Sequence, residues 1–243
     1  MTDTDPPIKP LGRKAYGSIG HIHGSRLGPG DHHVHEGQSA ICTTAAPKGT
    51  RVTVQTKLDG SCVAAALLDT GELVALGRAG YLARTSNYEM HHMWADWVET
   101  NEARFRHVLQ PGERLVGEWL AQAHGTRYDL TGREPFVAFD IMTGDRRLTT
   151  DEFADRLYEG VWGDDEPFAT PDTMSGPLDP LDALNELYDY GADEPEGVVY
   201  RVETVRRGEW TVDFLAKWVR PDKIDGQYLT GEAVWNWRPE TNR

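Results

Sequence analysis

The residues with the clearest potential for chemistry are Lys57 and Asp59, in the stretch Lys57-Leu58-Asp59-Gly60. The preceding run, Arg51 to Thr56, alternates and is rich in β-branched residues, which predicts a strand that enters a tight turn at Gly60. Alternation along an extended backbone would place Lys57 and Asp59 on the same side. Such a pair can serve catalysis, although by itself it is more typical of a polar hairpin turn.

Other charged residues stand within or at the ends of further predicted strands, flanked by apolar residues. The full set is Lys57, Asp59, Arg78, Glu118, Asp140, Glu196 and Lys217. A structural role explains any one of them, because a buried charge needs a partner. Together they indicate a shared polar cleft. Cations bind phosphates and carboxylates hold hard divalent ions, so this mixture suits a nucleoside triphosphate with magnesium.

The elements that would position these residues are mostly strands. β-branched and apolar runs predict strands over 51–56, 62–68, 72–76, 114–121, 136–141, 196–201 and 211–219. Apolar periodicity predicts helices over 88–109, 149–158 and 178–190. Residues 16–50 are expected to be rich in loops, and residues 160–180 to form an acidic, proline-rich surface loop. The pattern predicts an α+β fold with antiparallel sheets around a cleft.

The composition is that of a globular protein with an acidic surface. The chain has 243 residues, of which 39% are hydrophobic, and a formal net charge of −14. A polynucleotide substrate would therefore need a local basic groove that overrides the global charge. No apolar run approaches the roughly 20 residues that span a bilayer, and no signal peptide is evident. Cys42 and Cys62 do not make a disulfide framework, so we expect a cytoplasmic protein that does not enter a membrane.

Histidines are concentrated near the N-terminus. Five of them lie between residues 21 and 35, namely His21, His23, His32, His33 and His35. No carboxylate–histidine pair in this segment has convincing helical spacing for a transition metal. A substrate-binding or cofactor-covering loop is the favoured interpretation.

The order of these motifs resembles the covalent nucleotidyltransferases, the polynucleotide ligases and mRNA-capping enzymes. Six stretches carry the resemblance: Lys57-Leu58-Asp59-Gly60 (motif I), Arg78-Ala79-Gly80 (Ia), Gly117-Glu118-Trp119 (III), Phe139-Asp140-Ile141 (IIIa), Glu196-Gly197-Val198-Val199 (IV) and Ala216-Lys217-Trp218 (V). Each motif is weak alone, but six in order over residues 50–220 are a specific signal. The resemblance implies a ligase/capping-enzyme adenylyltransferase fold, in which sheets flanked by helices form a nucleotide-binding cleft.

Two features favour the ATP-dependent RNA ligase branch, of the small stand-alone type. Ser61 follows Gly60 as in RNA ligases, and Cys62 stands where DNA ligases and capping enzymes usually carry an arginine. Those branches also append an OB-fold domain after motif V, and the 23 residues after Arg220 are too few for one. A DNA ligase that seals nicked DNA stays an alternative. So does an adenylylating or nucleotide-binding module that does not ligate and needs an accessory nucleic-acid-binding partner.

The resemblance implies a role for each site residue. Lys57 would attack ATP to form lysyl-AMP, with Lys217 neutralising the α-phosphate. Asp59 and Glu196 would be the catalytic carboxylates and the ligands of Mg2+ or Mn2+. The expected nucleotide-binding residues are Thr56, Arg78, Glu118, Phe139, Lys217 and Arg220. Asp140 is expected to be structural.

The chain departs from the family pattern at two positions. Val219 replaces the second lysine of motif V, which leaves Arg220 or Lys223 to supply a second phosphate contact. Thr56 stands where many RNA ligases have a glutamate, which changes the contacts expected near the adenine.

We expect four segments along the chain. They are a disordered lead (1–15), a His/Gly-rich segment packed on the domain (16–50), the adenylation domain (51–225) and a short C-terminal tail (226–243).

Overall fold

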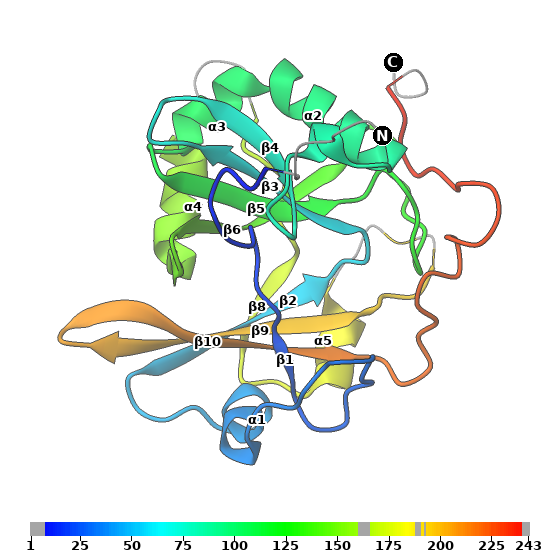
Figure 1. Cartoon of the computed structure of the whole chain (residues 1–243). Helices are drawn as coiled ribbons and strands as arrows, with labels where there is room; N and C mark the ends of the chain where they lie inside the picture. The colour runs from blue at the N-terminus through cyan, green and yellow to red at the C-terminus, as the bar shows by residue number, and fades with distance from the viewer. Residues whose placement is uncertain (1–7, 160–165, 188–190, 192, 240–243) are drawn as a thin grey trace. The chain divides into compact units, whose positions relative to one another are not determined.

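The computed structural model describes residues 8–159, 166–187, 191 and 193–239. The chain divides into two compact units, each with its own five-stranded sheet (Figure 1). Unit 1 comprises Met1–Gly17, Ser61–Trp119 and Phe136–Ala169, and unit 2 comprises Ser18–Gly60, Leu120–Pro135 and Thr170–Arg243. The segment expected to form one adenylation domain, residues 51–225, therefore contributes to both units.

The sheet of unit 2 has the strand order β1-β10-β9-β2-β8. These strands are β1 (Gly20–His21), β10 (Glu209–Val219), β9 (Gly197–Arg206), β2 (Thr50–Lys57) and β8 (Thr173–Gly176). The short strand β1 pairs with β10 in parallel, and all other neighbours are antiparallel. In Figure 1, β9 and β10 form a long hairpin at the centre of this sheet.

One face of this sheet is apolar and the other is polar. Alternate residues such as Val54, Val198, Tyr200 and Trp218 join one buried cluster. Cys42, from α1 (Glu36–Thr43), and Ala183, from α5 (Pro180–Glu186), complete that cluster. The residues between these positions, which include the cations of the predicted site, lie on the opposite face.

The sheet of unit 1 has the order β4-β3-β5-β6-β7 and is antiparallel throughout. Its strands are β4 (Leu73–Gly77), β3 (Ser61–Leu67), β5 (Glu113–Trp119), β6 (Phe136–Thr143) and β7 (Arg146–Arg147). Its helices are η1 (Ala83–Thr85), α2 (Glu89–Thr100), α3 (Glu102–Val108) and α4 (Thr150–Glu159). Aromatic rings join the helices to the sheet in one core of Trp94, Trp97, Phe105, Trp119, Phe136 and Phe168.

The predicted fold class is confirmed: this is an α+β protein with two sheets that are antiparallel apart from β1. Each predicted strand is present within a few residues of its expected position. None of the helices in the described part of the chain is long and apolar enough to cross a membrane.

The prediction of a single helix over 88–109 is wrong. The structure has two helices, α2 and α3, that meet at Asn101. The side-chain amide of Asn101 donates to the carbonyl of Trp97 at 2.8 Å and competes with the backbone ladder. Its ψ of 19° leaves the helical region, so the apolar periodicity continues while the helix does not.

Three short elements lie where loops were predicted, namely β1, α1 and β8. The helix predicted over 178–190 is shorter, because α5 ends at Glu186 and Leu187 is extended. Residues 188–190 of that prediction lie outside the described residues. The same applies to residues 1–7 of the lead, 160–165 of the acidic loop and 240–243 of the tail.

The C-terminal segment, residues 221–239, forms backbone hydrogen bonds along residues 121–124 of the same unit. The amide of Tyr228 donates to the carbonyl of His124 at 2.8 Å, and the amide of Ala123 donates to that of Val234 at 2.9 Å. Asn236 adds a side-chain bond to the carbonyl of Leu120 at 2.8 Å. The described part of the expected tail is therefore an integral part of unit 2.

Candidate active site

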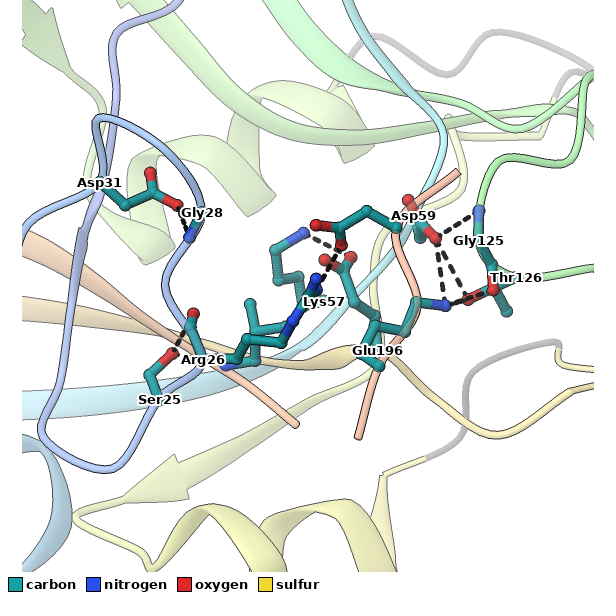
Figure 2. A network of polar contacts seen from close by, with 12 residues as sticks. Ser25, Arg26, Gly28, Asp31, Lys57, Asp59, Gly125, Thr126 and Glu196 are labelled. Carbon is teal, nitrogen blue, oxygen red and sulfur yellow. Dashed lines mark hydrogen bonds and ion pairs between the residues drawn. The ribbon is translucent and has the colours of Figure 1, made fainter. Parts of the chain in front are cut away.

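The centre of the site is the pair formed by Lys57 and Glu196, at adjacent ends of β2 and β9. Antiparallel register places Lys57 opposite Gly197, so Glu196 directly precedes its strand partner. Lys57 Nζ lies 2.5 Å from Glu196 Oε2, and Figure 2 shows the two side chains pointing toward each other. The Lys57 side chain is 20% exposed, whereas that of Glu196 is 9% exposed. The amine is thus both oriented and accessible.

Glu196 is held by its backbone as well as by Lys57. Its carbonyl accepts from the amide of Arg220 at 3.0 Å. A Cβ on Gly197 would lie 2.0 Å from the carbonyl oxygen of Trp218, so only glycine permits this close approach of β9 and β10. Burial raises the pKa of Glu196, Lys57 opposes that shift, and the nearby charge of Asp59 adds to it.

Lys217 extends onto the same face of the sheet. It pairs with Val199 on β9, and Val199 also pairs with Gln55, two residues before Lys57 on β2. Cross-strand partners share a face, so Lys217 and Lys57 emerge on the same side. Lys217 Nζ lies 3.7 Å from Asp31 Oδ1, a partner contributed by the histidine-rich segment.

Asp59 takes part in a second arrangement, which we call the clamp: Asp59, Gly125, Thr126 and Lys223. Asp59 Oδ2 accepts from the Gly125 amide at 2.8 Å and lies 3.1 Å from Lys223 Nζ. Lys223 also donates to the Gly125 carbonyl at 2.5 Å and to the Thr126 hydroxyl. Figure 2 shows Asp59, Gly125 and Thr126 beside the Lys57–Glu196 pair. The clamp joins the motif I turn to the C-terminal segment.

Lys57, Asp59, Glu196 and Lys217 therefore all lie in unit 2. Lys57 and Glu196 pair with each other, whereas Asp59 pairs with Lys223 and Lys217 lies near Asp31. Strand β2 ends at Lys57, so the alternation that placed Lys57 and Asp59 on one side does not extend into the turn. Asp59 is nonetheless close enough for its charge to act on Glu196.

Two predicted nucleotide-binding residues are placed differently from Lys57. Thr56 is buried and pairs with Val198, so by alternation it belongs to the apolar face of the sheet. Arg220 forms ion pairs with Glu194 and, at 3.2 Å, with Asp222. Neither arrangement brings the side chain to the Lys57–Glu196 pair.

The remaining predicted residues lie in unit 1. Arg78 is exposed at the end of β4 and donates to the carbonyl of Gly17 at 3.1 Å. Glu118 lies on β5, half-buried, between Cys62 and Val137. Phe139 is the extra residue of a bulge between β5 and β6, and its ring is 5.2 Å from that of Tyr16.

Asp140, predicted to be structural, is buried and accepts two side-chain hydrogen bonds. Its Oδ2 accepts from Arg147 at 2.9 Å and from the Tyr16 hydroxyl at 3.1 Å. This polar pair lies within unit 1, next to Phe139, and it fixes the strand on which Phe139 sits.

Sequence reasoning did not predict the pairings of two polar residues of unit 2, Asp31 and Lys223. Asp31 lies in the segment that the histidines singled out, but nothing in the spacing ties it to Lys217. Lys223 was considered as a phosphate contact, yet its side chain is only 4% exposed and is committed to the clamp. Both pairings join residues far apart in sequence, which no local pattern encodes.

The donor set near Lys57 fits a hard divalent cation. Glu196 and Asp59 supply carboxylate oxygens, and their mutual repulsion in a buried setting would be relieved by a bound Mg2+ or Mn2+. Within the described ranges, no group of three or more His, Cys, Asp or Glu residues is arranged to hold a metal. Any such ion would therefore share its coordination with a phosphate or with water.

Several solved structures share this fold. A mutant of Naegleria gruberi RNA ligase in the apo form gives a TM-score of 0.51 at 17% identity, over 90% of this chain and 62% of that chain. A mutant of the same enzyme with ATP and Mn gives 0.50 at 19%, over 89% and 62%. An archaeal ATP-dependent RNA ligase gives 0.48 at 21%, over 70% and 42%.

These chains are longer than this one, which spans between about two fifths and three fifths of their length. At such low identity the likeness shows the fold. No curated protein matches the sequence. A family model described as RNA ligase matches residues 50–219, which is more than half of the chain. The match covers motif I through motif V, and this protein belongs to the RNA ligase family.

Proposed function

We propose that this protein is an ATP-dependent RNA ligase that joins 5′-phosphate and 3′-hydroxyl RNA ends through a lysyl-AMP intermediate. The observation that carries the proposal is the placement of Lys57: an oriented, accessible amine at the end of a strand, 2.5 Å from a buried carboxylate. Membership of the RNA ligase family supports the same assignment. Cys42 and Cys62 are free thiols, which supports the reducing cytoplasm as the proposed location.

In the first step, Lys57 Nζ attacks the α-phosphorus of ATP. A P–N bond forms, the bond to the bridging oxygen of the β-phosphate breaks, and pyrophosphate leaves with the electron pair. The attack needs the neutral amine. Glu196 Oε2 accepts a hydrogen bond from Nζ. Burial raises the pKa of Glu196, which makes its carboxylate a better acceptor for the proton that Lys57 must lose.

In the later steps, AMP passes from Lys57 to the 5′-phosphate of RNA, and the 3′-hydroxyl displaces AMP to seal the strand. Lys217, on the same face as Lys57, stabilises negative charge on the α-phosphate as it develops. Glu196 and Asp59 would hold a divalent cation, which supplies further positive charge at the phosphates when bound.

The nucleotide contacts expected from unit 1 complete the proposal. Arg78 and Glu118 would bind the ribose and phosphate, and Phe139 would stack on the adenine. The exposure of Arg78 and the partial exposure of Phe139 are consistent with such contacts. Arg220, which is already paired with two acids, would act mainly by holding Glu196 through its backbone amide.

A second candidate is an adenylylating module that does not seal ends by itself. In that case the protein would form lysyl-AMP but would depend on a partner to hold the nucleic acid.

The test is incubation with α-³²P-ATP and Mg2+, a denaturing gel, and then a chase with 5′-phosphorylated RNA or nicked DNA. We expect a labelled protein whose label RNA discharges into a sealed product. Lys57→Ala should abolish the label, while Lys48→Ala, at an exposed position, should retain it. Discharge by nicked DNA alone would make the protein a DNA ligase. Stable label with no discharge would favour the module, and no label with any nucleoside triphosphate would refute the proposal.

A further inference from the structure

The histidine-rich segment contributes a strand and a return loop to unit 2. The amide of Ile22 donates to the carbonyl of Lys217 at 2.9 Å, which docks β1 onto β10. The chain then turns back, and residues 32–34 pair with His21 on its other side: the His21 amide donates to His32 and the Val34 amide donates to His21, each at 2.8 Å. This return delivers Asp31 to the polar face of the sheet.

His21 is the buried base of this arrangement. It is a direct strand neighbour of Lys217, and its side chain is 2% exposed. Its Nδ1 lies 2.6 Å from the Ser25 hydroxyl, which in turn accepts from the amide of Val219 at 2.9 Å. The imidazole is therefore held in place by Ser25, which is itself hydrogen-bonded to the backbone of Val219 on β10.

Asp31 lies between His21 and Lys217. Its Oδ2 is 3.1 Å from His21 Nε2 and accepts from the Gly28 amide at 3.0 Å. Its Oδ1 is 3.7 Å from Lys217 Nζ. Oδ2 is thus anchored to the loop by the Gly28 amide and lies beside the buried ring, and Oδ1 faces the lysine. Figure 2 shows Asp31 held over the Gly28 amide, away from the clamp.

We propose that Asp31, oriented by His21, is a positioning residue for Lys217 during formation of lysyl-AMP. A lysine side chain has many rotamers, and its head must meet the α-phosphate at a defined point to stabilise charge there. The anchored carboxylate restricts where the ammonium lies. Small displacements of a catalytic group are costly in rate, so this restraint is worth measuring.

Two other cations near this face, Arg26 and Lys57, have acid partners of their own. Arg26 pairs with Asp225 at 2.7 Å, and Lys57 pairs with Glu196. Asp225 is therefore a matched control, because it is an acid paired with Arg26, a cation of the same N-terminal segment. The inference rests on the proposed function, and wild-type labelling tests that function separately.

The experiment compares Asp31→Asn, Asp31→Glu and Asp225→Asn in single-turnover labelling with α-³²P-ATP over a range of ATP concentrations. We expect Asp31→Asn to lower the maximal rate by about tenfold with less than about a twofold change in apparent KM, because Lys217 acts in the transition state. Asp31→Glu should recover part of the rate, and Asp225→Asn should stay within about twofold of the wild type. All three variants should keep the wild-type melting temperature to within a few degrees.

Three results would overturn the inference while wild-type labelling persists. They are an Asp31→Asn rate within twofold of the wild type, an equal loss in Asp225→Asn, or a loss that goes with a lower melting temperature and is not relieved in Asp31→Glu. Absence of labelling in the wild type would instead refute the proposed function.

Discussion

Two lysines of unit 2, Lys57 and Lys223, each meet a carboxylate, and their surroundings differ. Lys57 is 20% exposed and lies at the end of a strand, against Glu196. Lys223 is 4% exposed and directs its ammonium at Asp59, the Gly125 carbonyl and the Thr126 hydroxyl. An ammonium has three N–H donors, so the clamp can use all of them.

The difference in exposure and in partners indicates a chemical role for Lys57 and a structural role for Lys223. Lys57, the proposed nucleophile, must be able to give up its proton and reach a phosphate. This requires access to the amine and a partner that can accept the proton. Glu196 suits that need, because burial raises its pKa and favours its neutral form. Lys223 joins three chain segments and has no such freedom. Under the proposed function, an ion pair of the same residue types serves catalysis in one place and fixes a turn in the other.

The largest expected effect is on catalysis at the Lys57 end. Glu196→Ala should lower the single-turnover labelling rate about 100-fold or more, because it removes the group that orients Lys57 and a proposed ligand for the divalent ion. His32→Ala, on the exposed histidine-rich segment, should change the rate by less than about threefold. Equal losses of labelling rate in the two variants would instead indicate that the histidines bind the metal or a phosphate.

The next effect is on stability and distinguishes the two lysines directly. Lys223→Met should lower the free energy of unfolding by about 3 kcal/mol, because it leaves a carboxylate and a carbonyl without their buried partner. Lys57→Met should cost about 1 kcal/mol or less, since Glu196 can take up a proton in place of the lost ion pair. Urea unfolding at neutral pH measures both. Equal losses would mean that the Lys57–Glu196 pair is as architectural as the clamp.

A smaller effect tests how tightly the clamp is closed. A Cβ at Gly125 would lie 2.5 Å from the carbonyl oxygen of Ile224 and 2.7 Å from Asp59 Oδ2. Gly125→Ala should therefore destabilise the protein by about 2 kcal/mol, because backbone must move. Gly37→Ala is the matched control: nothing lies within 4 Å of its Cβ, and it is in α1, where alanine should stabilise by about 0.5 kcal/mol. A neutral Gly125→Ala would show that the turn and the C-terminal segment can separate freely.

Local pattern was sufficient to predict the polar face of unit 2. Lys57, Glu196 and Lys217 stand in or beside strands whose alternation is regular, so their residue types and positions already implied their side of the sheet. The fold class followed from the same strands. These predictions depend on period and propensity, which a single sequence displays.

What the sequence did not reveal depends on long-range or competing interactions. The partners of Asp59 and Lys217 come from segments distant in sequence, through Lys223 and Asp31. The break at Asn101 arises because a side-chain amide competes with the helix backbone, against an unbroken apolar period. The short helix α1 is weakly encoded, and its buried Cys42 and the sheet beneath it stabilise it.

The smallest effect is a pH dependence of stability that involves two histidines of unit 2, the buried His21 near Lys217 and the half-buried His124 near Asp59. Burial lowers the pKa of His21, and the charge of Lys217 lowers it further while Asp31 opposes the shift. Burial also lowers the pKa of His124, against the charge of Asp59. Both rings are therefore easier to protonate in the unfolded chain, where the pKa is about 6.5.

The unfolded state thus binds more protons below about pH 6.5, so stability is complete above that pH and falls as the pH drops toward the folded-state values. Between pH 7.5 and 5, we expect each histidine to account for about 1 kcal/mol of that fall. His21→Gln and His124→Gln should each flatten the profile from urea unfolding, and exposed His107→Gln should leave it unchanged. If His124→Gln alone flattened it, the ring beneath Lys217 would be more hydrated than its burial implies. That result would also weaken the argument that His21 fixes Asp31.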